Sequence, residues 1–244
     1  FAPVPLKLAR TSANPEAAAV PEDAAAPEAI GAACHEGSPD TAGHEVAAVA
    51  PVLFAAGSEQ KSTFAFVRGS DAFVSQHVGD LENAEAFDAW LDAKSRFELR
   101  AARLACDAHP EYLASKWARE QARKLNIPLV EVQHHHAHIA SVIGENGLSG
   151  AVCGIAFDGT GFGADGSIWG GEVLLANAQA YERFANFAYV PMPGGAACVK
   201  NPLRMAYGVL WEFDLLEHPA AKRVLGALGE QADLCDQMIE RGLN

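Results

Sequence analysis

The chain has 244 residues, of which 50% are hydrophobic, enough for a core in one large domain or in two smaller lobes. Its 18 Lys and Arg against 31 Asp and Glu give a formal net charge of −13, which argues against binding nucleic acid through phosphate contacts. The five cysteines form no C-x-x-C pair, and no apolar run reaches the roughly 18 residues of a membrane-spanning helix, so we expect a cytoplasmic protein without a disulfide framework.

Residues 1–50 differ in composition from the remainder of the chain. They hold 16 alanines and 6 of the 13 prolines, and their one aromatic residue is Phe1. No apolar periodicity is sustained over this segment. Such a composition predicts a linker that is mostly flexible.

Residues 51–148 are predicted to form one α/β lobe. Short β-prone runs separated by Gly-Ser turns predict an antiparallel meander, and Asp80 or Asn83 can cap the helix that follows it. The predicted elements are strands at 52–56, 63–68 and 72–76, a helix with an apolar stripe from Phe87 to Phe97, a strand at 103–107, a helix at 111–124, a strand at 129–133 and a helix at 135–146. This order fits a mixed sheet flanked by helices and is the order of one lobe of the ribonuclease-H-like, actin-like architecture.

Residues 149–244 are predicted to begin a second lobe. The expected elements are strands at 151–157, 167–175 and 184–190 and helices at 202–213 and 220–228. These elements are too few for a complete lobe. We therefore expect an α/β fold with a first actin-like lobe and an incomplete second one.

Four histidines lie within five positions at a predicted strand-to-helix junction, in the run Gln133-His134-His135-His136-Ala137-His138. One helical turn separates His134 from His138, so both imidazoles can converge on one divalent cation. His135 and His136 point elsewhere on the helix, either as donors behind the ligands or toward solvent. The alternative is a surface or hydrogen-bonded cluster without a metal, because a metal site needs a further, acidic ligand from another element.

Asp158 is the candidate for that acidic ligand. It ends a predicted strand and opens a glycine-dense turn, Asp158 to Gly166, whose backbone amides can approach phosphate oxygens closely. The alternative is a hairpin that needs glycines for its backbone conformation. A dinucleotide site is excluded because a predicted strand, not a helix, follows the turn.

Three further places carry candidate binding residues, each with a plain alternative. Lys61 lies in a polar hairpin that faces the nucleotide cleft in actin-like lobes, or is an ordinary turn lysine. Glu172, after two glycines, is a ligand-facing acid or part of a β-bulge. Gly194 and Gly195 precede a predicted helix start, where free amides suit anionic groups, or they form a simple connection. No G-x-S-x-G motif, P-loop or Cys–His pair supports a nucleophilic hydrolase.

Six strings follow one another along the chain: Ser75–Asn83 (SQHVGDLEN), Asp107–Tyr112 (DAHPEY), Val132–His138 (VQHHHAH), Asp158–Gly161 (DGTG), Trp169–Glu172 (WGGE) and Pro193–Gly195 (PGG). In this order they resemble the HypF carbamoyltransferase family, which matures nickel–iron hydrogenases. The similarity spans roughly residues 51–215. It implies part of a Kae1-like, actin-like C-terminal catalytic domain, and it implies that the family's acylphosphatase, zinc-finger and adenylate-forming domains would precede Phe1.

The resemblance implies carbamoyl transfer. In this family an upstream domain makes carbamoyl-adenylate from carbamoyl phosphate and ATP, and a domain like this one passes the carbamoyl group to the C-terminal cysteine thiol of HypE. The resemblance implies that His134, His138 and Asp158 are the catalytic residues and hold a divalent metal. Two imidazoles and a carboxylate suit zinc or iron, and also nickel, so the sequence does not name the ion. It also implies that Gly159, Thr160 and Gly161 line the phosphate and that Gly194 and Gly195 lie near the nucleoside, with Lys61 and Glu172 as further candidates on the nucleotide side.

Two other functions stay open at this point. Threonylcarbamoyl transfer to tRNA adenosine shares the two-histidine helix, although the acidic composition argues against a nucleic-acid substrate. A non-catalytic fragment that binds metal and nucleotide and only contacts HypE is the second alternative.

Overall fold

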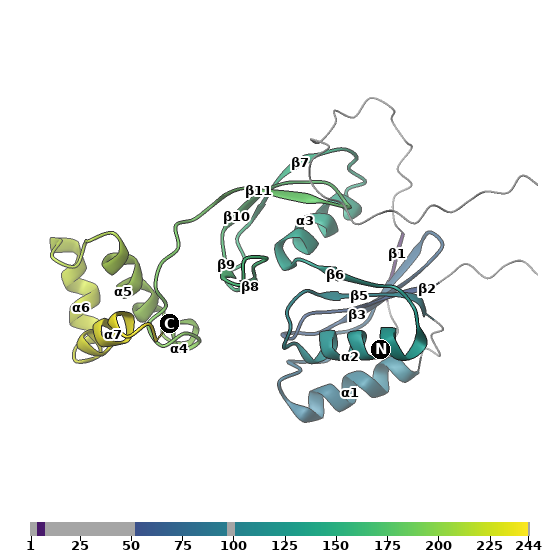
Figure 1. Cartoon of the computed structure of the whole chain (residues 1–244), viewed down its shortest axis with the longest axis horizontal. Coiled ribbons are helices and arrows are strands. Elements are labelled where there is room, and N and C mark those ends of the chain that lie inside the picture. The colour runs from purple at the N-terminus through teal and green to yellow at the C-terminus, as the bar shows by residue number, and fades with distance from the viewer. Residues whose placement is uncertain (1–3, 8–51, 97–100, 244) are drawn as a thin grey trace, which may run out of the picture. The chain divides into compact units, whose positions relative to one another are not determined.

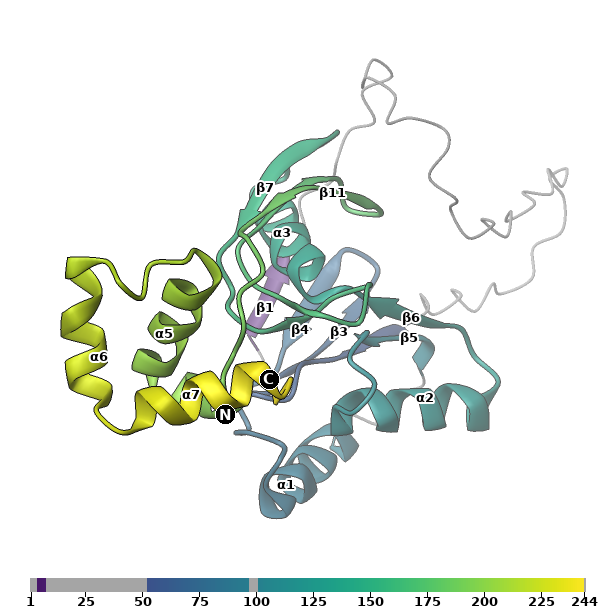
Figure 2. The same ribbon diagram turned by 60° about the vertical axis from the view of Figure 1, so that its left-hand side comes forward.

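The computed structural model describes residues 4–7, 52–96 and 101–243. The chain divides into two compact units, Phe1–Asn186 and Phe187–Asn244. Figures 1 and 2 show the elements of each unit, labelled in chain order.

The first unit contains a six-stranded mixed sheet. Its strands are β1 (Val4–Lys7), β2 (Val52–Ala56), β3 (Phe64–Arg68), β4 (Asp71–Val74), β5 (Ala101–Asp107) and β6 (Leu129–Val132), in the order β1-β4-β3-β2-β5-β6. Strands β1 to β4 pair antiparallel, whereas β2, β5 and β6 run parallel. The mixed sheet confirms the predicted α/β class. Strand β1 lies within the segment 1–50 that is predicted to be a mostly flexible linker; its residues 4–7 pair with β4, which is distant in the sequence.

Helices α1 (Ala84–Ser95) and α2 (Leu113–Leu125) cover one face of this sheet (Figures 1 and 2). Asn83, one of the two predicted caps, accepts the backbone N–H of Glu85 and so begins α1. The apolar stripe of α1 is confirmed for Phe87, Trp90, Leu91 and Ala93, which pack in the core, and Phe97 lies outside the described residues. Helix α2 begins where the buried carboxylate of Glu59 accepts the N–H of Leu113. The core between sheet and helices is largely aromatic and aliphatic: Phe54, Phe64, Leu81, Trp90, Leu104 and Ala118.

Helix α3 (His134–Glu145) follows β6 and packs on a second sheet within the same unit. That sheet has three antiparallel strands in the order β11-β10-β7, namely β7 (Val152–Ala156), β10 (Glu172–Ala176) and β11 (Tyr181–Asn186). A two-stranded ladder, β8 (Gly161–Phe162) and β9 (Ile168–Trp169), lies between β7 and β10 in the sequence. Ile139 and Ile143 of α3 share a core with Ala156, Trp169, Leu174 and Ala176.

Two strand predictions in this region are wrong. The strand expected at 167–175 is divided into β9 and β10, because Gly170 and Gly171 interrupt it and Gly171 has φ +90°. Gly170 also approaches the carbonyl of Gly159 so closely that a Cβ would lie 2.7 Å from that oxygen. The strand expected at 184–190 is β11, which lies earlier because its pairing with β10 starts at Tyr181. Pairing with β10, rather than local β propensity, thus decides where β11 begins.

The second unit is helical. It contains α4 (Ala197–Lys200), α5 (Pro202–Glu212), the 3-10 turn η1 (Pro219–Ala221), α6 (Lys222–Leu228) and α7 (Gln231–Glu240). Helices α5, α6 and α7 pack on one another around Tyr207, Leu228, Cys235 and Ile239. The sequence predicts α5 and α6 but not α7, because most residues of α7 are polar and only Cys235 and Ile239 are buried.

The predicted lobe boundary at 148/149 lies between the two sheets of the first unit and stays a prediction. Among the described residues, no helix has the length and apolar character needed to cross a membrane.

Candidate metal centre

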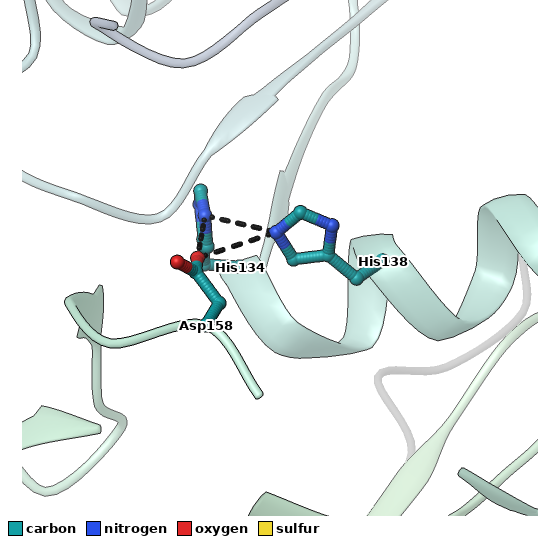
Figure 3. Close-up of side chains that lie close together, drawn as sticks. All are labelled: His134, His138 and Asp158. Atoms are coloured by element: carbon teal, nitrogen blue, oxygen red, sulfur yellow. Dashed lines mark hydrogen bonds and ion pairs between the residues drawn. The ribbon is translucent and has the colours of Figure 1, made fainter. Parts of the chain in front are cut away.

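Two histidines from α3 and one aspartate from the turn after β7 meet at one point (Figure 3). His134 is the first residue of α3 and His138 lies one turn later, so their Nε2 atoms are 3.3 Å apart. The Asp158 Oδ2 atom lies 2.8 Å from Nε2 of His134 and 3.3 Å from Nε2 of His138. The structure therefore brings together the three residues that the sequence singles out as catalytic and metal-ligand candidates.

A fourth residue, Asp107, contacts His134 on the side of the ring that faces away from His138 and Asp158. It ends β5, the parallel neighbour of β6, so it lies beside the start of α3. Its Oδ2 atom is 2.6 Å from Nδ1 of His134. A carboxylate only accepts, so Nδ1 of His134 carries the proton and Nε2 is left to face the shared point. A carboxylate behind a histidine in this way orients many metal-binding imidazoles.

Asp107 is not among the site residues expected from the sequence. The signal that can find it is topological, because residues at the carboxyl ends of adjacent parallel strands lie at the same sheet edge. The loop after Asp107 is held by Arg119 of α2, whose guanidinium donates to the carbonyls of Ala108, His109 and Pro110. This fixes the backbone from which Asp107 projects.

The ionisation of the group is consistent with a shared site. The hydrogen bond that His134 donates to Asp107 raises the pKa of His134 above its ordinary value, against the opposing effect of burial. Burial alone would raise the pKa of Asp158, but His134 and His138 outweigh burial and lower it. A proton and a metal ion therefore compete for the same imidazole nitrogen.

The other two histidines of the run are buried: the ring of His135 lies against Gly161 of β8 and near Trp169 of β9, whereas His136 lies against the turn between β10 and β11. His135 has its Nε2 atom 3.1 Å from the carbonyl oxygen of Asp158. His136 has its Nε2 atom 2.8 Å from the carbonyl oxygen of Asn177, in the turn between β10 and β11. Of the two roles left open from the sequence, exposure to solvent is excluded for both.

We call His134, His138 and Asp158 the triad, and the glycine-dense turn starts at its third member, Asp158. Gly159 and Thr160 are exposed, and Gly161 opens β8 against the ring of His135. Glu172 is buried and its two oxygens accept from Arg183, while one of them also accepts the N–H of Gly170. In this structure Glu172 holds the backbone of Gly170, which lies close to the carbonyl of Gly159, and its predicted contact with a nucleotide stays a prediction.

Two cavities adjoin the triad. One of about 330 Å³ is lined by Gly57 and Ser58 of the β2–β3 hairpin together with Asp107, His134 and His138. Another, of about 660 Å³, runs between α3 and β7 and reaches His138 and Asp158 at one end. Lys61 lies exposed in the same hairpin as Gly57, in a left-handed backbone conformation with its N–H donated to Asp80.

Gly194 and Gly195 belong to the second unit and both have positive φ. They form the turn before α4, in which the N–H of Gly194 donates to the carbonyl of Leu243. Their predicted place near a nucleoside is not addressed by the contacts of that unit and stays a prediction.

Comparison with known proteins identifies the family. Residues 48–145 match the family model described as the HypF Kae1-like domain, and residues 154–244 match that of the second subdomain of the carbamoyltransferase Kae1-like domain. The chain belongs to the HypF carbamoyltransferase family. It is 42% identical to carbamoyltransferase HypF2 of Cupriavidus necator over 164 residues, which are 66% of this chain and 20% of that protein. It is 38% identical to carbamoyltransferase HypF of Rhizobium leguminosarum over 68% of this chain and 22% of the relative.

Solved structures of HypF share the fold. A crystal structure of full-length HypF in the phosphate- and nucleotide-bound form superposes with a TM-score of 0.70 and 35% identity, covering 80% of this chain and 31% of that one. HypF of T. kodakarensis gives a TM-score of 0.69 and 33% identity over 81% of this chain and 28% of that one. The predicted HypF resemblance and fold class are thus confirmed. The chain spans about a fifth of the length of the curated HypF proteins above.

Proposed function

We propose that this chain carries the carbamoyl-transfer site of a HypF carbamoyltransferase. The group would pass from carbamoyl-adenylate, made by an upstream domain, to the C-terminal cysteine thiol of HypE. The observation that carries the proposal is the meeting of His134, His138 and Asp158 at the first residue of a glycine-dense turn, in a chain of the HypF family.

The three side chains fit a divalent metal. Two imidazole nitrogens and one carboxylate oxygen lie within 4.8 Å of one another, a donor set that leaves coordination positions for a substrate. Zinc and iron both accept these donors, so the chemistry does not select between them. When bound, such an ion polarises an oxygen of the substrate and stabilises charge that develops during transfer.

The remaining residues would bind and orient the adenylate. The backbone amides of the exposed residues Gly159 and Thr160 suit its phosphate oxygens, and the 330 Å³ cavity beside the triad offers room for a small polar group. The thiolate of the acceptor cysteine attacks the carbamoyl carbon, so a carbon–sulfur bond replaces the bond between that carbon and the phosphate oxygen. AMP is the leaving group, and the thiol proton passes to solvent.

The experiment supplies carbamoyl-adenylate and a peptide that ends in the HypE C-terminal cysteine. Mass spectrometry follows the gain of one carbamoyl group on the peptide. We expect the double variant His134→Ala/His138→Ala to lose transfer on the order of 100-fold or more, because the charge stabilisation of a metal amounts to several kcal/mol. Lys124→Ala is the control, since Lys124 pairs with Glu120 on the exposed side of α2.

Equal transfer by the wild type and the double variant would contradict the proposed site. Binding of metal and nucleotide by the wild type without any transfer would favour a non-catalytic module. Modification of tRNA adenosine in a parallel reaction with a threonylcarbamoyl donor would favour the tRNA alternative instead.

A further inference from the structure

The side chain of His135 is completely buried, whereas that of its neighbour His134 is partly exposed. Both of its ring nitrogens have partners. Nδ1 lies 3.2 Å from the side-chain nitrogen of Gln133, and Nε2 lies 3.1 Å from the backbone oxygen of Asp158. His135 thus joins the start of α3 to the residue that opens the glycine-dense turn.

The neighbours determine which nitrogen of His135 carries the proton. The Oε1 atom of Gln133 accepts the N–H of His136 at 2.8 Å, so the other end of that amide is its NH₂ group. This NH₂ group donates to the carbonyl of Phe162 and to Nδ1 of His135. Nδ1 is therefore the acceptor, and Nε2–H donates to the Asp158 carbonyl. The imidazole acts here as a neutral donor.

Close packing leaves this bond little freedom. A Cβ built at Gly161 would lie 2.3 Å from Cε1 of His135, so only a residue without a side chain allows the turn to lie this near the ring. The turn is thus tied to α3 on both sides of Thr160, at the Asp158 carbonyl and at Gly161. Its distance from the helix is set by His135.

We propose that Gln133 and His135 form a positioning pair, which holds the backbone of Asp158 so that its carboxylate faces His134 and His138. His135 does not touch the shared point of the triad; it acts through Asp158. This inference rests on the proposed metal site for its functional meaning, whereas the hydrogen bonds of the positioning pair are present in the chain without a metal. It also gives the third histidine of the run a function distinct from ligation.

His136 provides a matched comparison within the same helical turn. It is buried like His135 and its Nε2 atom also meets a backbone carbonyl, but that carbonyl belongs to Asn177 and not to the turn. A merely structural role predicts similar consequences for the loss of either imidazole. A positioning role predicts a local effect at Asp158 for His135 alone.

The test compares His135→Met, His135→Gln and His136→Met in the full chain. Methionine fills the space without a strong donor, whereas the glutamine amide can donate from near the Nε2 position. In the metal-free chain, we expect His135→Met to speed amide hydrogen exchange in residues 158–163 by about tenfold, the loss of roughly one hydrogen bond. His135→Gln should restore most of the protection, and His136→Met should leave this segment unchanged.

The same variants are then titrated with Co²⁺ as a spectroscopic probe. We expect His135→Met to weaken cobalt binding by about 10–100-fold and to alter the visible absorption band, as happens when a residue that orients a ligand is removed. Gln133→Glu is a second variant that keeps the packing: its carboxylate still accepts from His136 but can no longer donate to Nδ1 of His135 or to the carbonyl of Phe162. Nδ1 of the neutral imidazole then carries the proton and donates to the new carboxylate, so Nε2 no longer donates to Asp158 and the exchange effect of His135→Met should be reproduced.

Several results would overturn the positioning pair. They are equal exchange in residues 158–163 for the methionine variants at 135 and 136, no rescue by His135→Gln, or an unchanged segment in Gln133→Glu. If the wild type binds no cobalt, the proposed metal site fails, and the hydrogen-exchange comparison still decides whether the positioning pair holds the backbone of Asp158.

Discussion

The first turn of α3 uses neighbouring imidazoles for different purposes. His134 and His138 turn their Nε2 atoms to Asp158, while His135 and His136 direct theirs to backbone carbonyls inside the protein. The difference follows from helical geometry, because residues four apart share a face and adjacent residues do not. A run of histidines that looks uniform in sequence is thus divided into a candidate metal-binding pair and a buried pair whose rings contact backbone carbonyls.

Asp107 offers the most direct test at the residue scale. Asp107→Asn keeps a hydrogen-bond acceptor for His134 but removes the negative charge, and we expect it to weaken zinc binding by about 10–100-fold near pH 8. Because Asp107 is the largest cause of the raised pKa of His134, the wild type retains the competing proton to a higher pH. Wild-type affinity should therefore fall first as the pH decreases, and the gap between the two proteins should narrow toward about pH 6.

Isothermal titration calorimetry over this pH range measures both effects. Asp92→Asn is the control carboxylate, since it pairs with Arg96 on the exposed side of α1. A gap that stays constant or widens at low pH would contradict this account of His134.

At the scale of the elements, features that depend on residues close in sequence could be predicted, whereas features that depend on the pairing of distant strands could not. Asn83 could be named as a cap and the spacing of His134 and His138 could be interpreted, because both depend on residues one turn apart. Asp107 could not be placed beside His134 from spacing, since 27 positions separate them in the chain. Its location depends on the parallel pairing of β5 with β6, and the start of β11 depends likewise on its pairing with β10.

The packing of α3 on β7 is a tight contact between two elements. A Cβ at Gly154 of β7 would lie 2.4 to 2.8 Å from three side-chain atoms of Ile139. We expect Gly154→Ala to destabilise the fold by about 1–3 kcal/mol through overpacking. In an Ile139→Ala background the same substitution should have a much smaller effect, because the clashing atoms are gone.

Chemical denaturation of the two single variants and the double variant measures this coupling as a double-mutant cycle. Gly144→Ala on the same helix is the control: nothing lies within 4 Å of its Cβ, so it should be neutral or slightly stabilising. Additive effects of Gly154→Ala and Ile139→Ala would contradict the proposed contact.

At the scale of the whole molecule, every side chain of the candidate metal centre belongs to the first compact unit. Zinc at about 100 times its dissociation constant should therefore stabilise that unit by about 2.7 kcal/mol. Three of the four tryptophans lie in this unit and Trp211 lies in the second, so the fluorescence of Trp211→Phe reports unfolding of the first unit.

Amide hydrogen exchange in residues 187–243 serves as the internal comparison for this prediction. We expect zinc to raise the unfolding midpoint seen by fluorescence without changing exchange in that segment. Equal protection of the second unit, or an identical midpoint shift in His134→Ala/His138→Ala, would show that zinc acts elsewhere.

The candidate ligands also lie on both sides of a topological division. His134 and His138 follow directly after β6 of the six-stranded sheet, whereas Asp158 follows β7 of the three-stranded sheet. An ion held by all three would act as a cross-link that closes a loop of about 25 residues, comparable in chain topology to a disulfide bond. Removal of the ion by a chelator would then be equivalent to reducing a disulfide bond. The backbone would gain conformational freedom mainly in the segment that joins the two sheets.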